Sequence, residues 1–219
     1  SASKLGTQIA FMEGRPDVGI SYTDAFYFRH GMPNEKIRNF EYVKDREFKL
    51  TDESWIIRSD WSDNGTLVQQ LYSRNLAPIN SMLIRKQVFD AIGNFDESFV
   101  LLEDWYFFLK AAINDIRFTY FDNEAAYAKI RVHEDSSSYR GERISWYYMK
   151  MMVNIEQEIH LRHLSFIPPN KQIDMNGRQF IRHNGLTNLP KINALAKLLG
   201  WGRVIKLYLK ELNAARKAR

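Results

Sequence analysis

Two adjacent carboxylates, Glu103 and Asp104, stand directly before the aromatic run Trp105-Tyr106-Phe107-Phe108. If a helix begins at this point, acids in its first turn are favoured, because unpaired backbone N–H groups and the helix macrodipole attract negative charge. A carboxylate that aromatic packing holds rigidly at the wall of a cleft can also take a proton from a substrate hydroxyl. Helix capping and general-base catalysis therefore both stay open on the residue types alone.

A second polar group lies where Lys129, Arg131 and His133 alternate with Ile130 and Val132. Successive side chains of a strand project to opposite faces, so the three polar residues share one side. Arg131 and His133 suit a phosphate or a metal ion. An ordinary hydrogen-bonded histidine at the end of a strand explains the same pattern.

The elements that must position these residues follow from hydrophobic periodicity and turn residues. Helical spacing predicts helices over 4–13, 67–75, 86–95 and 145–164, and one or two basic helices over 189–217, broken near residues 200–202. Runs of β-branched and aromatic residues predict strands over 18–28, 116–121 and 126–133, a turn into a short strand over 77–86, and a loop with a short strand or hairpin over 29–54. This mixture predicts an α/β protein.

Composition excludes several classes of protein. The chain has 219 residues, 45% of them hydrophobic, which suffices for one sizeable domain or for a domain with a helical appendage. It has no cysteine, so disulfide frameworks and thiolate metal sites are excluded. No apolar run approaches the length of a membrane-spanning helix and the opening residues lack a signal-peptide pattern, which fits a cytoplasmic protein. Phosphate-cradling glycine loops, G-x-S-x-G and H-E-x-x-H are all missing, which argues against a kinase, a serine hydrolase and a zinc enzyme.

The positive charge is concentrated at the C-terminal end. Residues 191–219 hold eight Lys or Arg and one acid, a local charge of +7, whereas the other 190 residues sum to −2 from 23 basic and 25 acidic side chains. A near-neutral body argues against a nucleic-acid partner. The tail helices are predicted to carry one apolar side, made of Leu195, Leu198, Leu199, Trp201, Ile205, Leu209 and Leu212. That side either packs on its own domain or a partner, or lies in the plane of an anionic membrane, which would make the protein membrane-peripheral.

Three segments in order resemble the C-terminal half of a family 2 glycosyltransferase domain of the GT-A type. They are NSMLIRK at 80–86, GNFDESFVLLEDW at 93–105 and KIRVHEDSSS at 129–138. In that family a short strand and helix precede a G-x-F-D-E segment, an E-D pair supplies the catalytic base, and a strand ending in R-x-H leads into a serine-rich loop. The opening stretch, 4–24, also looks like the helix and strand that follow the family's metal-binding D-x-D.

The resemblance implies a role for each matching residue near the reacting atoms. Asp104 matches the base that deprotonates the acceptor hydroxyl, and Glu103 matches its partner. Trp105 would shape the acceptor site, because aromatic faces suit the apolar faces of sugar rings.

The remaining matches concern substrate and metal binding. His133 matches a position that approaches the metal or the diphosphate in some members, and Arg131 lies on the same strand as a substrate-binding candidate. Asn80 and Ser81 match a segment where the domain contacts donor or acceptor.

The resemblance implies a nucleotide-sugar-dependent inverting glycosyltransferase, of the hexosyltransferase type, in bacterial cell-surface polysaccharide synthesis. Its donor would be a nucleotide sugar such as a UDP-sugar, its acceptor a glycan or a lipid-linked glycan, and its complete domain would use Mn²⁺ or Mg²⁺. The expected architecture is a partial, Rossmann-like GT-A domain over 1–140 followed by a helical extension over 141–219. The alternative from another class is a non-catalytic interaction module with a basic helical tail.

The sequence departs from the family in its first half. The family's opening apolar strand, its nucleotide-binding βαβ region and its D-x-D are missing here, and Asp60 and Asp63 have the wrong spacing to replace the last. We therefore expect an acceptor-side portion of a longer domain, inactive alone.

A titration tests this expectation. Isothermal titration of the 219-residue chain with UDP-sugars and Mn²⁺ should show no micromolar binding, because the ligands for the metal and the two phosphates are missing. Micromolar binding would contradict the expected division of the domain.

Overall fold

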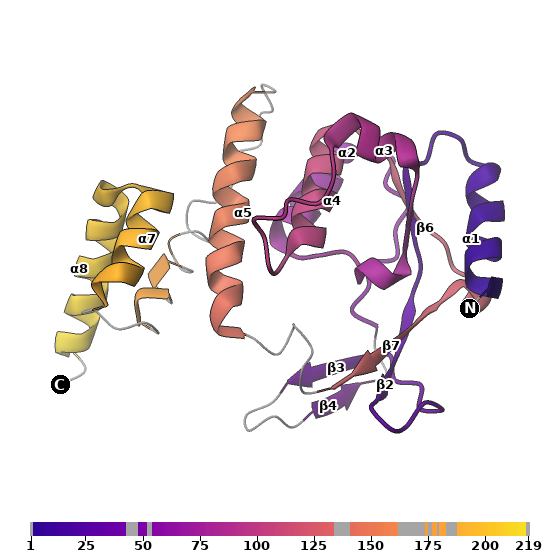
Figure 1. Cartoon of the computed structure of the whole chain (residues 1–219), viewed down its shortest axis with the longest axis horizontal. Coiled ribbons are helices and arrows are strands. Elements are labelled where there is room, and N and C mark those ends of the chain that lie inside the picture. The colour runs from indigo at the N-terminus through magenta and orange to yellow at the C-terminus, as the bar shows by residue number, and fades with distance from the viewer. Residues whose placement is uncertain are drawn as a thin grey trace. The chain divides into compact units, whose positions relative to one another are not determined.

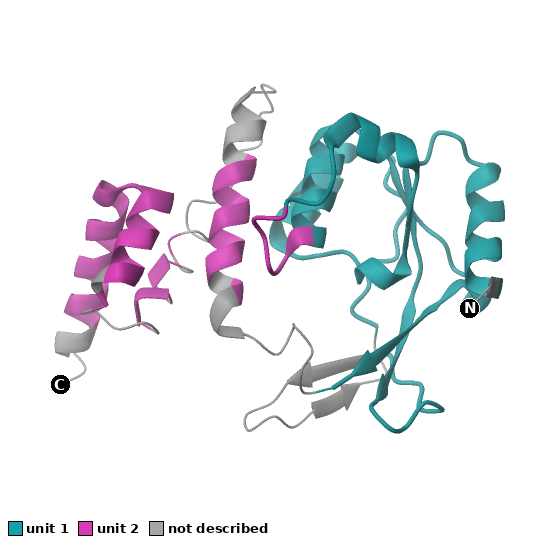
Figure 2. Ribbon diagram, in the orientation of Figure 1, with its two compact units in different colours: residues 1–96, 104–139 teal, residues 97–103, 140–219 magenta. Residues whose placement is uncertain are grey.

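In this computed structural model, residues 2–42, 48–51, 54–133, 141–161, 174, 177–178, 180–182 and 188–217 are described. They form two compact units, 1–96 with 104–139, and 97–103 with 140–219 (Figure 2). The break near residue 140 lies next to the boundary expected from the sequence. Residues 97–103, which we had placed in the first domain, group with the second unit.

The first unit is an α/β structure built on a small mixed sheet (Figure 1). Its helices are α1 (Ala2–Glu13), α2 (Asn64–Ser73), α3 (Lys86–Ile92) and α4 (Glu103–Ile113), with the short 3₁₀ helices η2 (Ile79–Ser81) and η3 (Glu124–Ala126). Its strands are β1 (Ile20–Tyr22), β2 (Ala25–Arg29), β3 (Asn39–Tyr42), β4 (Phe48–Thr51), β5 (Met82–Ile84), β6 (Phe118–Tyr120) and β7 (Ala128–Val132). The predicted helices and the hairpin within 29–54 are confirmed.

The predicted strand over 18–28 is wrong in one respect, because it is two strands in two sheets. β1 lies between β5, to which it is antiparallel, and β6, to which it is parallel. β2 instead pairs in parallel with β7. The segment that pairs with it makes the same change of sheet, from β6 to β7. Thr23 and Asp24, between β1 and β2, therefore lie opposite residues 121–127, between β6 and β7.

Backbone and side-chain hydrogen bonds join these two segments of the chain across the change of sheet. The N–H of Phe121 donates to the carbonyl of Tyr22 at 2.8 Å, and the N–H of Ala128 donates to that of Asp24 at 3.2 Å. The Thr23 hydroxyl donates to the carbonyl of Ala126 at 3.1 Å. Asp24 therefore occupies the point where a pair of strands leaves one sheet and enters the next.

Helices cover both faces of the three-stranded sheet (Figure 1). On one face, the buried amide of Gln8 in α1 donates to the hydroxyl of Ser21 at 3.1 Å and to the carbonyl of Ser81 at 3.1 Å. On the other, Phe108 of α4 packs edge-on against Phe118 of β6, with ring centroids 6.1 Å apart. Alternation along the strands produces this division, because neighbouring residues point to opposite faces.

The second unit is helical. It contains α5 (Gly141–Leu161), α7 (Leu189–Leu199) and α8 (Trp201–Lys217). Its core consists of Met149, Phe180, Ile181, Ile192, Leu195, Ala196, Val204 and Leu207. Gly200, at φ +80°, separates α7 from α8, which confirms the predicted break near 200–202.

Residues 97–103 belong to this unit because they are held on α5. The ammonium of Lys150 donates to the carbonyl of Ser98 at 2.9 Å and to its hydroxyl at 2.6 Å. It also lies 4.4 Å from the ring centroid of Phe99, which is 6.0 Å from that of Tyr147. The turn before α4 is thus built partly from groups more than forty residues later in the chain.

The inner side of α8 is fixed by a buried acid. Glu211 is 6% exposed and accepts from Arg178 at 2.5 Å and from Arg182 at 2.9 Å. These hydrogen bonds, that from Arg182 first, lower the pKa of the Glu211 carboxyl, although burial opposes them. α8 is therefore held by a charge-assisted contact as well as by the apolar residues Val204 and Leu207.

Replacing this acid should loosen α8. Glu211→Gln keeps the shape but loses the charge, and charge-assisted hydrogen bonds contribute about 2 kcal/mol. Amide hydrogen exchange in α8 of the full chain should become about 30-fold faster, since each 1.4 kcal/mol is a factor of about ten. Lys210→Gln, an exposed neighbour on the same helix, is the control and should leave exchange unchanged.

The effect should depend on pH in a defined direction. Because the folded pKa of Glu211 lies below the ordinary value of 4.5, its contribution is present above that value and is lost as the pH falls through the folded pKa. The stability of α8 should therefore differ most between wild type and Glu211→Gln near neutral pH, and this difference in stability should become smaller in acid. A difference that stayed constant from pH 7 to pH 3 would contradict the ionic account.

Candidate functional site

The acidic pair lies in the first turn of a helix, as predicted, since α4 begins at Glu103. The residue before it, Leu102, has φ +65°, in the left-handed region that residues with a Cβ rarely adopt. Such a conformation costs about 1–2 kcal/mol in a non-glycine residue. Strain of this kind concentrates at functional sites, where the surrounding structure must hold it in place.

The start of α4 is anchored through its aromatic residues. Tyr106, Phe107 and Phe108 are buried, which confirms the predicted core packing. Trp105 is half-buried, and its indole N–H donates at 2.6 Å to the carbonyl of Leu71 in α2. Because α2 fixes this large ring, the backbone beside it is fixed as well.

Asp104 is half-buried at the beginning of this rigid helix. One of its carboxylate oxygens accepts the backbone N–H of Trp105 at 2.7 Å. The neighbouring Glu103 is also half-buried. The carboxylate of Asp104, which the resemblance implies as the base, is thus held by a backbone N–H group in the first helical turn. This arrangement is compatible with helix capping and with proton transfer.

The two candidates in the NSMLIRK segment are placed differently from each other. Asn80 is exposed on η2. Ser81 is buried, and its hydroxyl donates to the carbonyl of Pro78 at 2.8 Å. η2 lies beside β7, so the structure brings this segment next to the strand that carries Arg131. Of the two, Asn80 has the accessible side chain.

The candidates on β7 follow the predicted alternation. Lys129 and Arg131 are exposed, Ile130 is half-buried and Val132 is buried. His133 follows the end of the strand and is half-buried. The serine-rich loop at 134–138 lies outside the described residues.

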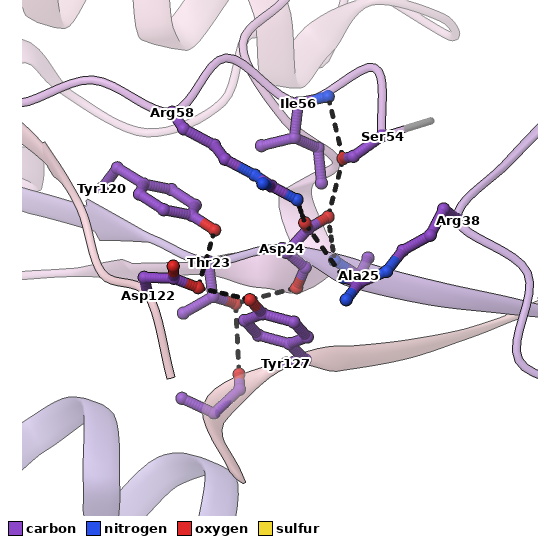
Figure 3. A network of polar contacts seen from close by, with 11 residues as sticks. Thr23, Asp24, Ala25, Arg38, Ser54, Ile56, Arg58, Tyr120, Asp122 and Tyr127 are labelled. Atoms are coloured by element: carbon purple, nitrogen blue, oxygen red, sulfur yellow. Dashed lines mark hydrogen bonds and ion pairs between the residues drawn. The ribbon is translucent and has the colours of Figure 1, made fainter. Parts of the chain in front are cut away.

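A network around Asp24 was not found by sequence reasoning (Figure 3). Asp24 is fully buried, and one of its oxygens accepts from Arg38 at 3.1 Å and from Arg58 at 2.5 Å. The other accepts from the hydroxyl of Ser54 at 2.8 Å and from the backbone N–H of Ala25 at 2.9 Å. Two guanidinium groups, a hydroxyl and a backbone amide thus donate to this buried carboxylate, which matches the roughly four hydrogen bonds that its two oxygens can accept.

The network extends to a second acid through two tyrosines. Asp122 accepts from the hydroxyl of Tyr120 at 3.2 Å and also from that of Tyr127. The bond from Tyr127 lowers the pKa of Asp122, while burial raises the pKa values of Tyr120 and Tyr127. The guanidinium of Arg38 lies 5.2 Å from the ring centroid of Tyr127 and so connects the two parts.

The charges within this network balance. Asp24 and Asp122 are matched by Arg38 and Arg58, so the group has no excess positive charge with which to attract an anion. Its donors and acceptors are directed at one another (Figure 3). We therefore assign it a structural role at the change of sheet.

Asp60 and Asp63, the acids compared with the D-x-D motif in the sequence, also have structural partners. Asp63 is the N-cap of α2 and accepts from the backbone N–H groups of Gly65 at 3.0 Å and Thr66 at 3.1 Å. Asp60 accepts from the hydroxyl of Thr119 at 2.7 Å and from Arg15 at 3.0 Å.

Within the ranges that the structure describes, no three His, Asp or Glu side chains gather as ligands for a metal ion. His133, the expected metal contact, is therefore not accompanied there by a ligand set. None of the helices in the described part of the chain combines the length and apolar character needed to cross a bilayer. Comparison with models of protein families, with curated proteins and with solved structures finds no match.

Removing the charge of Asp24 should destabilise the first unit. Asp24→Asn leaves two guanidinium groups beside a neutral, buried side chain, and breaking a buried ion pair costs about 3–5 kcal/mol. Both arginines reach solvent, so we expect about 3 kcal/mol, measured as a lower urea midpoint by tryptophan fluorescence. Asp90→Asn, at an exposed position of α3, is the control. Equal midpoints for the two variants would show that the network contributes little.

Proposed function

We propose that this chain is the acceptor-side part of a nucleotide-sugar-dependent, inverting glycosyltransferase resembling family 2, with Asp104 as the catalytic base. The observation that supports it most is the placement of Asp104. It stands in the first turn of α4, two residues after the strained Leu102 and beside Trp105, which α2 holds in place. The first unit, an α/β structure with a mixed sheet, would correspond to the C-terminal half of a GT-A domain.

In the proposed reaction, the carboxylate of Asp104 accepts the proton of an acceptor hydroxyl. The oxygen so activated attacks the anomeric carbon of the donor sugar and forms the new glycosidic bond. The bond from that carbon to the nucleoside diphosphate breaks, and the diphosphate leaves with the bonding electrons. One direct displacement inverts the configuration at the anomeric carbon.

The helix start contributes to this chemistry in two ways. Its backbone N–H groups and macrodipole favour the negative charge that a base needs before it accepts a proton. The packing of α4 fixes the direction of the carboxylate, and correct placement of reacting groups is among the largest contributions to catalysis.

The other candidates would bind the substrates. Trp105 would offer its aromatic face to the acceptor sugar, and Glu103 would position the acceptor or the base. Arg131 and Asn80 are accessible on β7 and η2, which lie side by side. The hydroxyl of Ser81 already donates within its own turn, so its contribution would come through the position of η2.

A divalent metal in the complete domain would neutralise the diphosphate as it leaves. The described residues do not assemble a ligand set for it, so the steps above use only groups of this chain. His133 stays the proposed point of approach to the metal or the diphosphate.

The second candidate function is a non-catalytic interaction module, in which Glu103 and Asp104 only cap α4. The observation in its favour is the hydrogen bond at 2.7 Å from the backbone N–H of Trp105 to the carboxylate of Asp104, because a capping acid accepts from the backbone in this way. The two functions differ in what Asp104 does, and a substitution there separates them.

Asp104→Asn should remove sugar transfer without unfolding the protein. In the complete protein that carries this chain, loss of a general base should lower kcat by about 10²–10⁴-fold. The assay follows transfer from radiolabelled UDP-sugars, with Mn²⁺, to extracted cell-surface glycan. Asp90→Asn, which removes an exposed acid of α3 outside the matching segments, is the control and should keep full activity. Full transfer by Asp104→Asn would eliminate the assigned base and favour the interaction module.

A further inference from the structure

The helix α8 has two separate apolar sides, whereas the sequence predicted one. Val204 and Leu207 point into the core of the second unit, and Glu211 on the same side is held by Arg178 and Arg182. These contacts fix the rotation of α8 about its axis. Any residue on another side of the helix is therefore held in a defined direction as well.

Three large apolar residues lie away from that core. Trp201, Ile205 and Leu209 follow one another at intervals of four, so they form one strip along the helix. Their side chains are 56%, 52% and 52% exposed. This outer strip corrects the sequence expectation, which had grouped these residues with the buried Leu195.

Cationic side chains accompany the outer strip. Lys206 and Lys210 are exposed, and the helical repeat places them roughly 100° and roughly 140° round the axis from the middle of the strip. Arg203, by contrast, is engaged at 2.8 Å with Asp174. The accessible surface of α8 therefore combines an apolar strip with a flank of lysines.

We propose that the outer strip of α8 docks on an anionic lipid surface, with the helix lying in the plane of the membrane. Trp201 would enter the interface between headgroups and acyl chains, where indole rings are favoured, together with Ile205 and Leu209. Lys206 and Lys210 would extend to the negatively charged headgroups, since long cationic side chains reach sideways to them. This inference does not depend on the proposed transferase activity.

Charge complementarity selects this occupant over a protein. Residues 191–219 carry a net charge of +7 and the whole chain carries +5, so a strongly anionic surface complements this segment better than a second copy of the chain does. Three partly exposed side chains also fall well short of the roughly 800 Å² per partner that a stable protein interface buries. An in-plane helix needs no such area, because lipid adapts to it and anionic headgroups add to the attraction.

The test measures binding of the full chain to vesicles by co-sedimentation. Wild type should pellet with phosphatidylcholine vesicles that contain phosphatidylglycerol and should stay in solution with phosphatidylcholine alone. Trp201→Ser, Ile205→Ser and Leu209→Ser together should lower binding to the anionic vesicles by at least about tenfold, since each apolar side chain favours the interface. Because all three are exposed, far-UV circular dichroism should match that of wild type.

A matched control comes from α1, where Leu5 and Ile9 are exposed at 51% and 40% with the same four-residue spacing. Leu5→Ser with Ile9→Ser removes apolar surface of the same kind elsewhere and should bind vesicles as wild type does. If this control lost binding to the same extent as the α8 variant, the assignment to the outer strip would be overturned.

A second variant tests the lysines. Lys206→Gln with Lys210→Gln should weaken binding to anionic vesicles by about tenfold or more, and added salt should weaken wild-type binding similarly. Equal, negligible pelleting of wild type with both lipid compositions would overturn the proposal. So would a dimer, detected by light scattering, that the strip variant abolishes while vesicle binding is unchanged.

Discussion

The structure of the first unit depends on the buried carboxylate of Asp24. An ionised acid removed from water costs several kcal/mol unless charged partners and hydrogen bonds replace the lost hydration. Here that requirement is met by Arg38 on one segment of the chain and by Ser54 and Arg58 on another. Folding therefore has to bring those segments to the place where β1 ends and β2 begins.

The segment that Arg58 holds leads on toward the candidate site. The hydroxyl of Tyr22 donates to the carbonyl of Ile57 at 2.7 Å and accepts from the indole of Trp61 at 2.8 Å. Asp63 then caps α2, and α2 supplies the carbonyl at Leu71 that receives the indole N–H of Trp105. A continuous series of contacts thus connects the buried acid in the sheet to the helix turn that presents Asp104.

The second unit uses the same physical solution on a helix. Glu211, like Asp24, is a buried acid that accepts from two arginines. Glu211 orients the helix α8, and Asp24 fixes the connection between β1 and β2. On α8 this has a consequence at the surface. Because Glu211, Val204 and Leu207 are buried on the inner side of α8, the outer strip lies on the exposed side of the helix. It is therefore accessible to another surface.

Local patterns in the sequence determined much of this structure. The start of α4 at Glu103, the break near residues 200–202 and the alternation along β7 were all predicted, because each depends on neighbouring residues. The acidic pair was singled out for the same reason. Its chemical role stays a prediction, since a capping acid and a catalytic base share the same local pattern.

Only the tertiary structure decided the features that depend on distant partners. Residues 18–28 are rich in β-branched and aromatic residues, and although Asp24 stands between β1 and β2, a single acid in such a run does not show that the chain changes sheet. That division depends on arginines 14 and 34 residues beyond Asp24. The helical repeat likewise predicted an apolar side for the tail, but two apolar sides on one helix cannot be ranked by periodicity. The contacts of Glu211 with Arg182 and Arg178, 29 and 33 positions earlier, determine which side of α8 is buried. Burial of an ionised acid is costly unless oppositely charged side chains are present to pair with it.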